Sequence, residues 1–392
     1  MILEGADEAP DQIAPYLVLS MLAGTTAGML RALSPILAIH LGATPAQIGV
    51  ISSFESLGMA SMTLPAGMLV ARFGPRNVYV SASVLITLAY CLTAAIASWP
   101  ALAASLCLGG ACMPFRIVSV SSSFLERLRS AGRSKAGWYA SSGTIGTLLV
   151  GPSLAAIFLA TAGPALGYLG IAAIFAAMGI YGARALSSRS HLQGVPGSSL
   201  DSIAETLRVL RNPVVSAVCL IEISSGIVFA FFTAFIVVTA IRYVGLSETQ
   251  AISIRMFEGA VAVLTGFIGG YLVRDRPIVW FYRVSLICIV AGFLTLSIAN
   301  NYATLVLATL MLGVGLGVSS LVNVMRISAV EVSKSRISSL QLFSSFSGAF
   351  IGALLGGTLT QLIGLHGMFA SGAAIYALLS FRWCFGGALG RR

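Results

Sequence analysis

Charged residues are scarce in this chain. Asp, Glu, Lys and Arg together make up 9% of its 392 residues, whereas hydrophobic residues make up 57%. A soluble domain carries about 25% charged residues, because its surface has to be hydrated. The composition therefore excludes a water-soluble globular protein and, because long apolar runs recur along the whole chain, predicts a membrane protein with many spans.

The chain also has little of what catalysis or ATP binding requires. It has three histidines, of which His40 and His366 lie at the outer-face loops and His191 lies in the linker. No Gly-x4-Gly-Lys-[Ser/Thr] loop is present, and no polar segment is long enough for a sizeable soluble domain. The six cysteines lack the spacing of a metal site. We therefore expect neither an enzyme nor an ATP-driven pump, and neither a metal nor a cofactor.

Twelve apolar segments are each long enough to cross the hydrocarbon core, which takes about 20 helical residues. They cover approximately residues 15–40, 47–71, 77–98, 101–124, 136–160, 164–186, 213–241, 248–273, 278–299, 302–328, 337–362 and 367–389. The expected architecture is all-α, with six spans in residues 1–186 and six in residues 213–392. In the linker, residues 187–212, apolar residues recur at helical spacing from Leu200 to Leu210, which predicts an amphipathic helix on the membrane surface.

The distribution of lysine and arginine predicts the orientation. If the N-terminus is cytoplasmic, the loops on that side carry nearly all of the loop arginines and lysines, and the outer loops carry only Arg242. Positive loops remain on the cytoplasmic side of a membrane. We therefore expect both termini to be cytoplasmic, in the inner membrane of the cell. The net charge of +10 then reflects topology and does not indicate binding to nucleic acid.

The two halves of the chain resemble each other. The matched residues are Phe54 with Phe257, Glu55 with Glu258, Gly42 with Gly245 and Gly67 with Gly270, all at an offset of 203, and Gly109 with Gly313 at 204. Since each half has an even number of spans, both copies have the same orientation in the membrane. Parallel repeats of this kind are related by an axis along the membrane normal, with a site between them near the midplane.

The stretch "GMLVARFGPR", which begins at Gly67, follows the second span. It resembles the signature Gly-x-Leu-x-Asp-Arg-x-Gly-Arg-Arg of the major facilitator superfamily. Gly67, Arg72, Gly74 and Arg76 match that signature, whereas Ala71 replaces its aspartate. In the family this aspartate helps to hold the cytoplasmic side in one state, so its replacement puts that contact in question.

Two further motifs extend the resemblance. A degenerate copy of the signature, from Gly270 to Asp275, follows the eighth span. Gly151-Pro152 in the fifth span resembles a motif of antiporters. The resemblance implies the twelve-helix fold of the family, transport of a small molecule by alternating access, and a gating role for these motif residues in a protein that works as a monomer.

Six charged residues lie inside the expected spans. They are Arg31, Glu55, Arg116, Glu222, Arg255 and Glu258. A charge at the bilayer centre costs about 2.5–3.5 kcal/mol, so each needs a partner, water or a function. Similar depths in spans joined by a short loop predict a pair of Arg31 with Glu55, and three-residue spacing predicts a pair of Arg255 with Glu258. Arg116 and Glu222, both in the cytoplasmic half of the membrane, form a third expected pair.

Two hypotheses explain these charges. In the first, they form structural ion pairs between helices; in the second, at least one glutamate exchanges a proton. Burial favours the neutral carboxylic acid and a nearby arginine favours the carboxylate, so a movement that separates such a pair changes its proton affinity. Arg116 is either an anion-binding group or a counter-ion. Asn323 and Gln341 are candidate cavity-lining residues.

The favoured hypothesis is a secondary transporter that exports a small organic solute in exchange for protons. One alternative is proton-driven uptake of an anionic metabolite or a metal chelate, bound by Arg31 and Arg116. Another is a sensor or assembly factor that has the fold but does not transport, for which Ala71 is the best support. Fold alone does not decide between these functions.

Overall fold

The computed structural model describes residues 9–131, 135–187, 208–272, 278–328 and 334–385, and every regular element in these residues is a helix. The first half contains α1 (Ala9–His40), α2 (Pro45–Phe73), α3 (Pro75–Ala95), α4 (Trp99–Ala131), α5 (Lys135–Ile145), the π-helix η1 (Gly146–Val150) and α6 (Gly151–Ala185). The second half contains the short 3-10 helix η2 (Val209–Arg211), α8 (Pro213–Val238), the π-helix η3 (Thr239–Tyr243), α9 (Glu248–Leu272), α10 (Ile278–Ser297), α11 (Tyr302–Ser328) and α12 (Lys334–Phe385).

Two of the long helices contain a sharp turn at a glycine. The φ angle is +80° at Gly163 in α6 and +73° at Gly364 in α12. Glycine adopts positive φ without the steric penalty of a Cβ atom. When α6 and α12 are each divided at that glycine, the described helices agree with the twelve expected spans. The predicted amphipathic helix lies almost entirely outside the described residues, and only η2 corresponds to its end.

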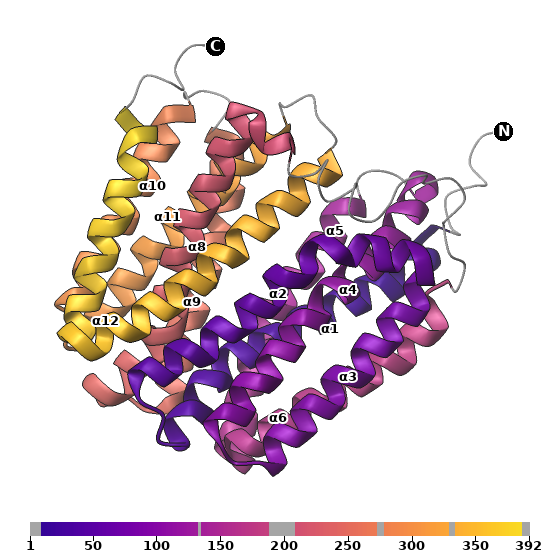
Figure 1. The fold of residues 1–392 in the computed structure, drawn as a ribbon, viewed down its shortest axis with the longest axis horizontal. Helices are drawn as coiled ribbons and strands as arrows, with labels where there is room; N and C mark the ends of the chain where they lie inside the picture. The colour runs from indigo at the N-terminus through magenta and orange to yellow at the C-terminus, as the bar shows by residue number, and fades with distance from the viewer. Residues whose placement is uncertain (1–8, 132–134, 188–207, 273–277, 329–333, 386–392) are drawn as a thin grey trace.

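The helices form two bundles (Figure 1). The bundle of residues 9–187 and the bundle of residues 208–385 converge at the end of the molecule that holds the loop between α1 and α2. They diverge toward the end at which α1 begins and α12 finishes. The principal contact between the bundles is that of α2 with α12, and α1 with α8 and α6 with α9 also touch.

The converging ends are held together by backbone contact and by two polar links. A Cβ atom on Gly49 in α2 would lie 2.6 Å from the carbonyl oxygen of Ala353 in α12, so only glycine permits this approach. The His40 Nε2 and Glu248 Oε1 atoms are 2.5 Å apart, and Arg242 donates a hydrogen bond of 3.1 Å to the carbonyl oxygen of Ala43. With the predicted orientation, these contacts close the outer face.

The duplication is repeated in the packing. A Cβ atom on Gly110 in α4 would lie 2.2 Å from the backbone oxygen of Glu55, and one on Gly313 in α11 would lie 2.8 Å from the backbone oxygen of Glu258. Gly313 follows Gly110 by 203 residues and Glu258 follows Glu55 by 203, so the second contact repeats the first. By this contact Gly110, and not Gly109 as expected from the sequence, is the counterpart of Gly313.

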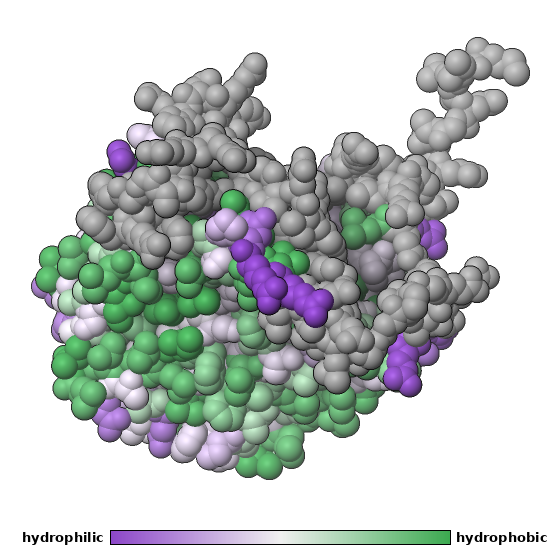
Figure 2. Space-filling model, turned by 45° about the horizontal axis from the view of Figure 1, so that its top comes forward, coloured by the Kyte–Doolittle hydropathy of each residue, from purple (hydrophilic) through white to green (hydrophobic). Residues whose placement is uncertain are grey.

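The surface agrees with a lipid environment. In Figure 2 apolar side chains cover most of the described surface in view. Large hydrophobic side chains are exposed on the outside of both bundles, with Leu88 at 62%, Leu362 at 78% and Leu378 at 78%. A soluble monomer rarely exposes continuous apolar area of this kind, so lipid is the environment that this surface fits.

Candidate functional site

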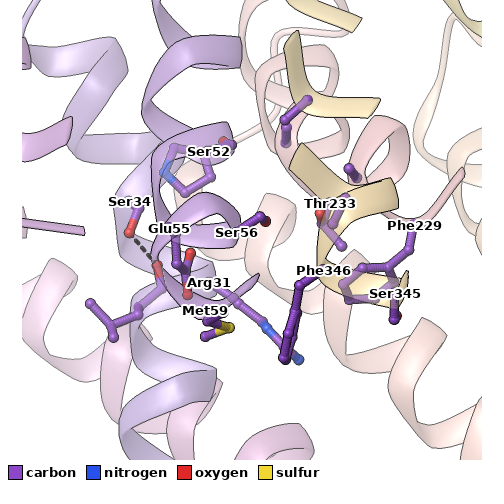
Figure 3. Close-up of a pocket in the computed structure, with 16 residues that line it drawn as sticks. Arg31, Ser34, Ser52, Glu55, Ser56, Met59, Phe229, Thr233, Ser345 and Phe346 are labelled. Carbon is purple, nitrogen blue, oxygen red and sulfur yellow. Dashed lines mark hydrogen bonds between the residues drawn. The ribbon is translucent and has the colours of Figure 1, made fainter. Parts of the chain in front are cut away.

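Four of the six expected intramembrane charges lie where the two bundles meet. Arg31 on α1 and Glu55 on α2 line a cavity of about 190 Å³ between α1, α2, α8 and α12 (Figure 3). We call it the main cavity. Its other lining residues include Ser52, Ser56, Phe229, Thr233, Ser345 and Phe346. It therefore combines one cation, one carboxylate, several hydroxyl groups and two aromatic rings.

A second cavity, of about 120 Å³, lies on the other side of Arg31. We call it the side cavity; its walls come from α1, η1, α6, α8 and α9. Arg255 and Glu258 line it together with Arg31, and Arg31 and Phe229 line both cavities. The guanidinium carbon of Arg31 is 5.4 Å from the centroid of the Phe229 ring. This cation–π contact forms the wall between the two cavities.

The expected pairs at this interface are close in space but not in contact. None of these four described side chains forms an ion pair within 4 Å; the ion pair found in the described part of the chain is that of His40 with Glu248. Instead, Arg31 lines the main cavity with Glu55 and the side cavity with Arg255 and Glu258. The reason is in the packing: α2 lies mainly against α4 and α12 rather than α1, so the short loop does not make α1 and α2 close partners.

Arg255 also lacks its expected contact. Its guanidinium carbon is 5.5 Å from the centroid of the Phe232 ring. Its side chain is 9% exposed, and its Nη1 atom is buried without a hydrogen-bond partner. A buried donor without an acceptor costs about 1–3 kcal/mol, and more when it is charged. Such a group is a position at which an acceptor can bind.

The expected pair of Arg116 with Glu222 does not exist. Arg116 on α4 is 2% exposed within the first bundle and donates a hydrogen bond of 3.0 Å to the hydroxyl of Tyr79 on α3. Its guanidinium carbon lies 4.4 Å from the centroid of the Phe175 ring and 4.9 Å from that of the Tyr79 ring. Arg116 is thus enclosed by aromatic rings and has no carboxylate partner among these contacts.

Glu222 has its partners within the second bundle. Its Oε1 atom accepts hydrogen bonds from Asn323 Nδ2 at 2.9 Å and from Gln341 Nε2 at 2.6 Å. The hydroxyl of Tyr282 donates to Asn323 Oδ1 at 3.0 Å. Three residues that the sequence analysis proposed separately therefore form one cluster, in which α8, α11 and α12 each contribute a side chain.

Sequence reasoning missed Tyr79 and Tyr282, as well as the aromatic residues of the main cavity. The two tyrosines are related by the repeat offset of 203, and each contacts a polar residue on the next helix. The offset could have identified them. No comparable sequence feature separates Phe229 and Phe346 from the other 18 phenylalanines of the chain.

The motif residues lie at helix ends and helix crossings. Gly74 separates α2 from α3 with φ at +81°, and Arg72 and Arg76 beside it are exposed. A Cβ atom on Gly67 would meet nothing within 4 Å. Gly270 lies in the last turn of α9, and Asp275 lies outside the described residues.

The antiporter-like motif lies at a crossing of two helices. Gly151 and Pro152 begin α6, directly after the π-helix η1. A Cβ atom on Gly151 would lie 2.5 Å from the carbonyl oxygen of Thr25 and 2.8 Å from the Cα atom of Gly28 in α1. The start of α6 and the middle of α1 are therefore in backbone contact one turn from Arg31.

Two helical bundles with an apolar outer surface and charged cavities between them have the architecture of a multi-pass membrane protein. The chain belongs to the Major Facilitator Superfamily, whose family model matches residues 16–346. Membership in this family makes it a transporter rather than an enzyme, with a small molecule as its cargo.

Solved structures share the fold. The nucleoside transporter NupG has a TM-score of 0.80 at 13% identity, over 95% of this chain and 98% of that one. A bacterial homologue of the human lysosomal transporter Spinster, in an inward-facing and unoccupied conformation, has a TM-score of 0.74 at 15% identity, over 96% and 98%. The comparison with curated proteins found no match. At these identities the likeness extends to the fold alone.

Proposed function

We propose that this chain is a proton-coupled transporter that exports a small organic solute across the cytoplasmic membrane by alternating access. One observation carries the proposal. Glu55 and Glu258 are related by the repeat and come from opposite bundles, and Arg31 lines the main cavity with Glu55 and the side cavity with Glu258. The whole site lies between the two halves of one chain, so a monomer suffices for transport.

The coupling follows from which bundle each charge belongs to. Arg31 and Glu55 are in the same bundle, so a rigid-body movement of the bundles leaves their separation nearly unchanged. Glu258 is in the other bundle, so its distance from Arg31 changes whenever the bundles rock. Arg255 is on the same helix as Glu258 and moves with it, so Arg31 is the cation whose distance from Glu258 changes. The carboxylate is favoured more strongly when Arg31 is near than when it has moved away. Glu258 is therefore the primary proton-exchanging residue in this proposal.

The direction of transport is proposed from the start of α6. Gly151-Pro152 resembles the motif of antiporters, and its backbone contact with α1 connects any bend of this helix to Arg31. A movement at this joint would shift the cation that both glutamates share. We infer exchange of solute for protons, with the solute leaving the cell.

Proteoliposomes with an internal pH-sensitive dye test this function. Uridine is the first solute to test, because a nucleoside transporter has the same fold; a panel of organic acids and bases follows. Export by exchange requires that an imposed solute gradient moves protons in the opposite direction. Glu258→Gln should lower proton-coupled flux at least about tenfold, which corresponds to about 1.4 kcal/mol. Glu205→Gln, in the predicted linker, is the matched control.

A second function has specific support. The unpartnered Nη1 of Arg255 and the position of Arg31 between two cavities favour an anionic cargo, and so proton-driven uptake of an anionic metabolite or metal chelate. Uptake by symport requires that protons move in the same direction as the solute. No proton movement with any solute would reject both transport proposals and favour a sensor or assembly factor.

A further inference from the structure

One cation of the side cavity, Arg255, has no role in the proposed proton-coupled export. Among the described residues that line this cavity, Arg31, Arg255 and Glu258 are ionisable, so these residues supply one more cation than anions. Arg255 is nine-tenths buried, and its Nη1 atom has no hydrogen-bond partner. A donor that is both charged and desolvated binds an acceptor more strongly than an exposed one does.

We propose that the side cavity binds the acidic group of the transported solute, while the apolar part of the solute occupies the main cavity beside Phe229 and Phe346. The inference rests on the proposed transport function and names the class of cargo: an organic anion with a planar apolar portion next to a carboxylate or similar group.

The volumes of the two cavities fit this arrangement. The side cavity has a volume of about 120 Å³, which is enough for an acidic group. The main cavity, at about 190 Å³, is the larger of the two and has the aromatic walls. The solute therefore lies across both, with its acidic end in the side cavity.

Arg31 connects the two parts of the site. It lines both cavities, so a solute that lies across both must pass alongside it. Its guanidinium group has five N–H donors in one plane, so it can stack on Phe229 and donate to an anion at the same time. Arg255 supplies the second set of donors from the opposite bundle. An anion held by both arginines would contact both halves of the transporter.

The side cavity also contains a neutral donor–acceptor group. The hydroxyl of Thr147 in η1 donates a hydrogen bond of 3.0 Å to the backbone oxygen of Gly143. Its oxygen therefore has no hydrogen to offer an anion. Recognition of the acidic group falls on the two arginines, and replacement of Arg255 is the decisive test.

Three probes with one ring and different charge test the inference on the full-length protein in detergent. Benzoate is anionic, benzamide neutral and benzylamine cationic. We expect radiolabelled benzoate to bind at least about tenfold more tightly than benzamide, and benzylamine to compete no better than benzamide. Equal affinities of the three probes would overturn the proposal, because water alone would then satisfy Arg255.

Two substitutions act in opposite directions. Arg255→Gln should reduce benzoate binding to the level of benzamide and leave benzamide binding unchanged, with the exposed Arg208→Gln as control. Glu258→Gln removes the negative charge that the described lining of the side cavity contains, and it should strengthen benzoate binding severalfold. A preference for benzoate that survives Arg255→Gln, or that weakens in Glu258→Gln, contradicts the proposal.

The binding assay is independent of proton flux. Selective benzoate binding without any proton-coupled flux would reject the proposed transport function and leave the anion subsite standing. Proton-coupled flux of a solute without selective benzoate binding would reject the subsite alone. A size-exclusion profile matching the wild-type protein excludes misfolding as the cause of lost binding.

Discussion

Each bundle contains a buried charged residue that is linked by hydrogen bonds to a repeat-related tyrosine. The two charges are stabilised by different kinds of neighbouring groups. In the first bundle, the hydroxyl of Tyr79 accepts a hydrogen bond from Arg116. In the second bundle, its counterpart Tyr282 donates a hydrogen bond to Asn323, which in turn donates to Glu222. The duplicated framework thus contains the same tyrosine, which contacts a cation directly in the first bundle and is linked to a carboxylate through Asn323 in the second.

The difference shows how each charge is stabilised inside the membrane. Arg116 is surrounded by ring faces, and its Nε atom has no hydrogen-bond partner. Glu222 accepts hydrogen bonds from two side-chain amides, those of Asn323 and Gln341. A cation can be stabilised by ring faces, but a carboxylate requires N–H or O–H donors. Removal of the two groups should therefore have unequal consequences.

The largest expected effect is at Glu222. Glu222→Leu removes two hydrogen bonds to a charged acceptor, each worth about 1.5–3 kcal/mol, and leaves two amide groups without their acceptor. We expect a loss of about 4 kcal/mol in unfolding free energy, measured by SDS titration of the detergent-solubilised protein. Glu222→Gln, whose amide oxygen still accepts from both partners, should lose only about 1 kcal/mol. Equal losses for both variants would disprove this account of the cluster.

The second effect compares the glycines that pack against the repeated glutamates. A methyl group at Gly110 would lie 2.2 Å from the Glu55 backbone oxygen, and at Gly313 it would lie 2.8 Å from that of Glu258. Overpacking of a well-packed interior costs about 1–3 kcal/mol. In the same SDS titration, Gly110→Ala should lose about 3 kcal/mol and Gly313→Ala about 1 kcal/mol. A larger loss for Gly313→Ala than for Gly110→Ala would contradict this expectation. It would show that the helices around Gly110 shift to accommodate the methyl group.

The smallest effect is expected at Arg116. Arg116→Met removes the hydrogen bond to Tyr79, two weaker ones to methionine sulfur atoms and two ring contacts. It also removes a buried charged donor, Nε, that has no partner. These contributions are each about 1–3 kcal/mol and have opposite sign. The unfolding free energy should change by less than about 1 kcal/mol. Arg116→Ala, which leaves a void, serves as the contrasting variant. A loss as large as that of Glu222→Leu would refute the proposed asymmetry between the bundles.

The sequence predicted the spans and the duplication because both depend on patterns along the chain. Hydropathy alone identifies a helix that crosses a membrane, and the offset of 203 placed Glu55 and Glu258 in equivalent positions. The depth of a charged residue in the membrane could also be estimated from its distance in sequence to the end of its span, because each helical residue rises 1.5 Å.

Pairing of the charges was not predictable in this way. Depth gives a position along the membrane normal but not the direction in which a side chain points from its helix. Arg116 and Glu222 were therefore paired by depth although they lie in different bundles. Arg31 and Glu55 were paired through a short loop, but the loop did not decide which helices pack together. Asn323 and Gln341 were recognised as polar residues in spans, yet their contact with Glu222 required the fold.

The contact of Gly49 with α12 affects how the two bundles can separate at their converged ends. Backbone meets backbone there, so no side chain has to change rotamer or withdraw from a pocket before the helices separate. The two polar links at these ends involve the exposed side chains of His40 and Arg242, which solvent can hydrate as soon as the links break. At this crossing, opening therefore requires water to enter between two backbones and does not require side chains to repack.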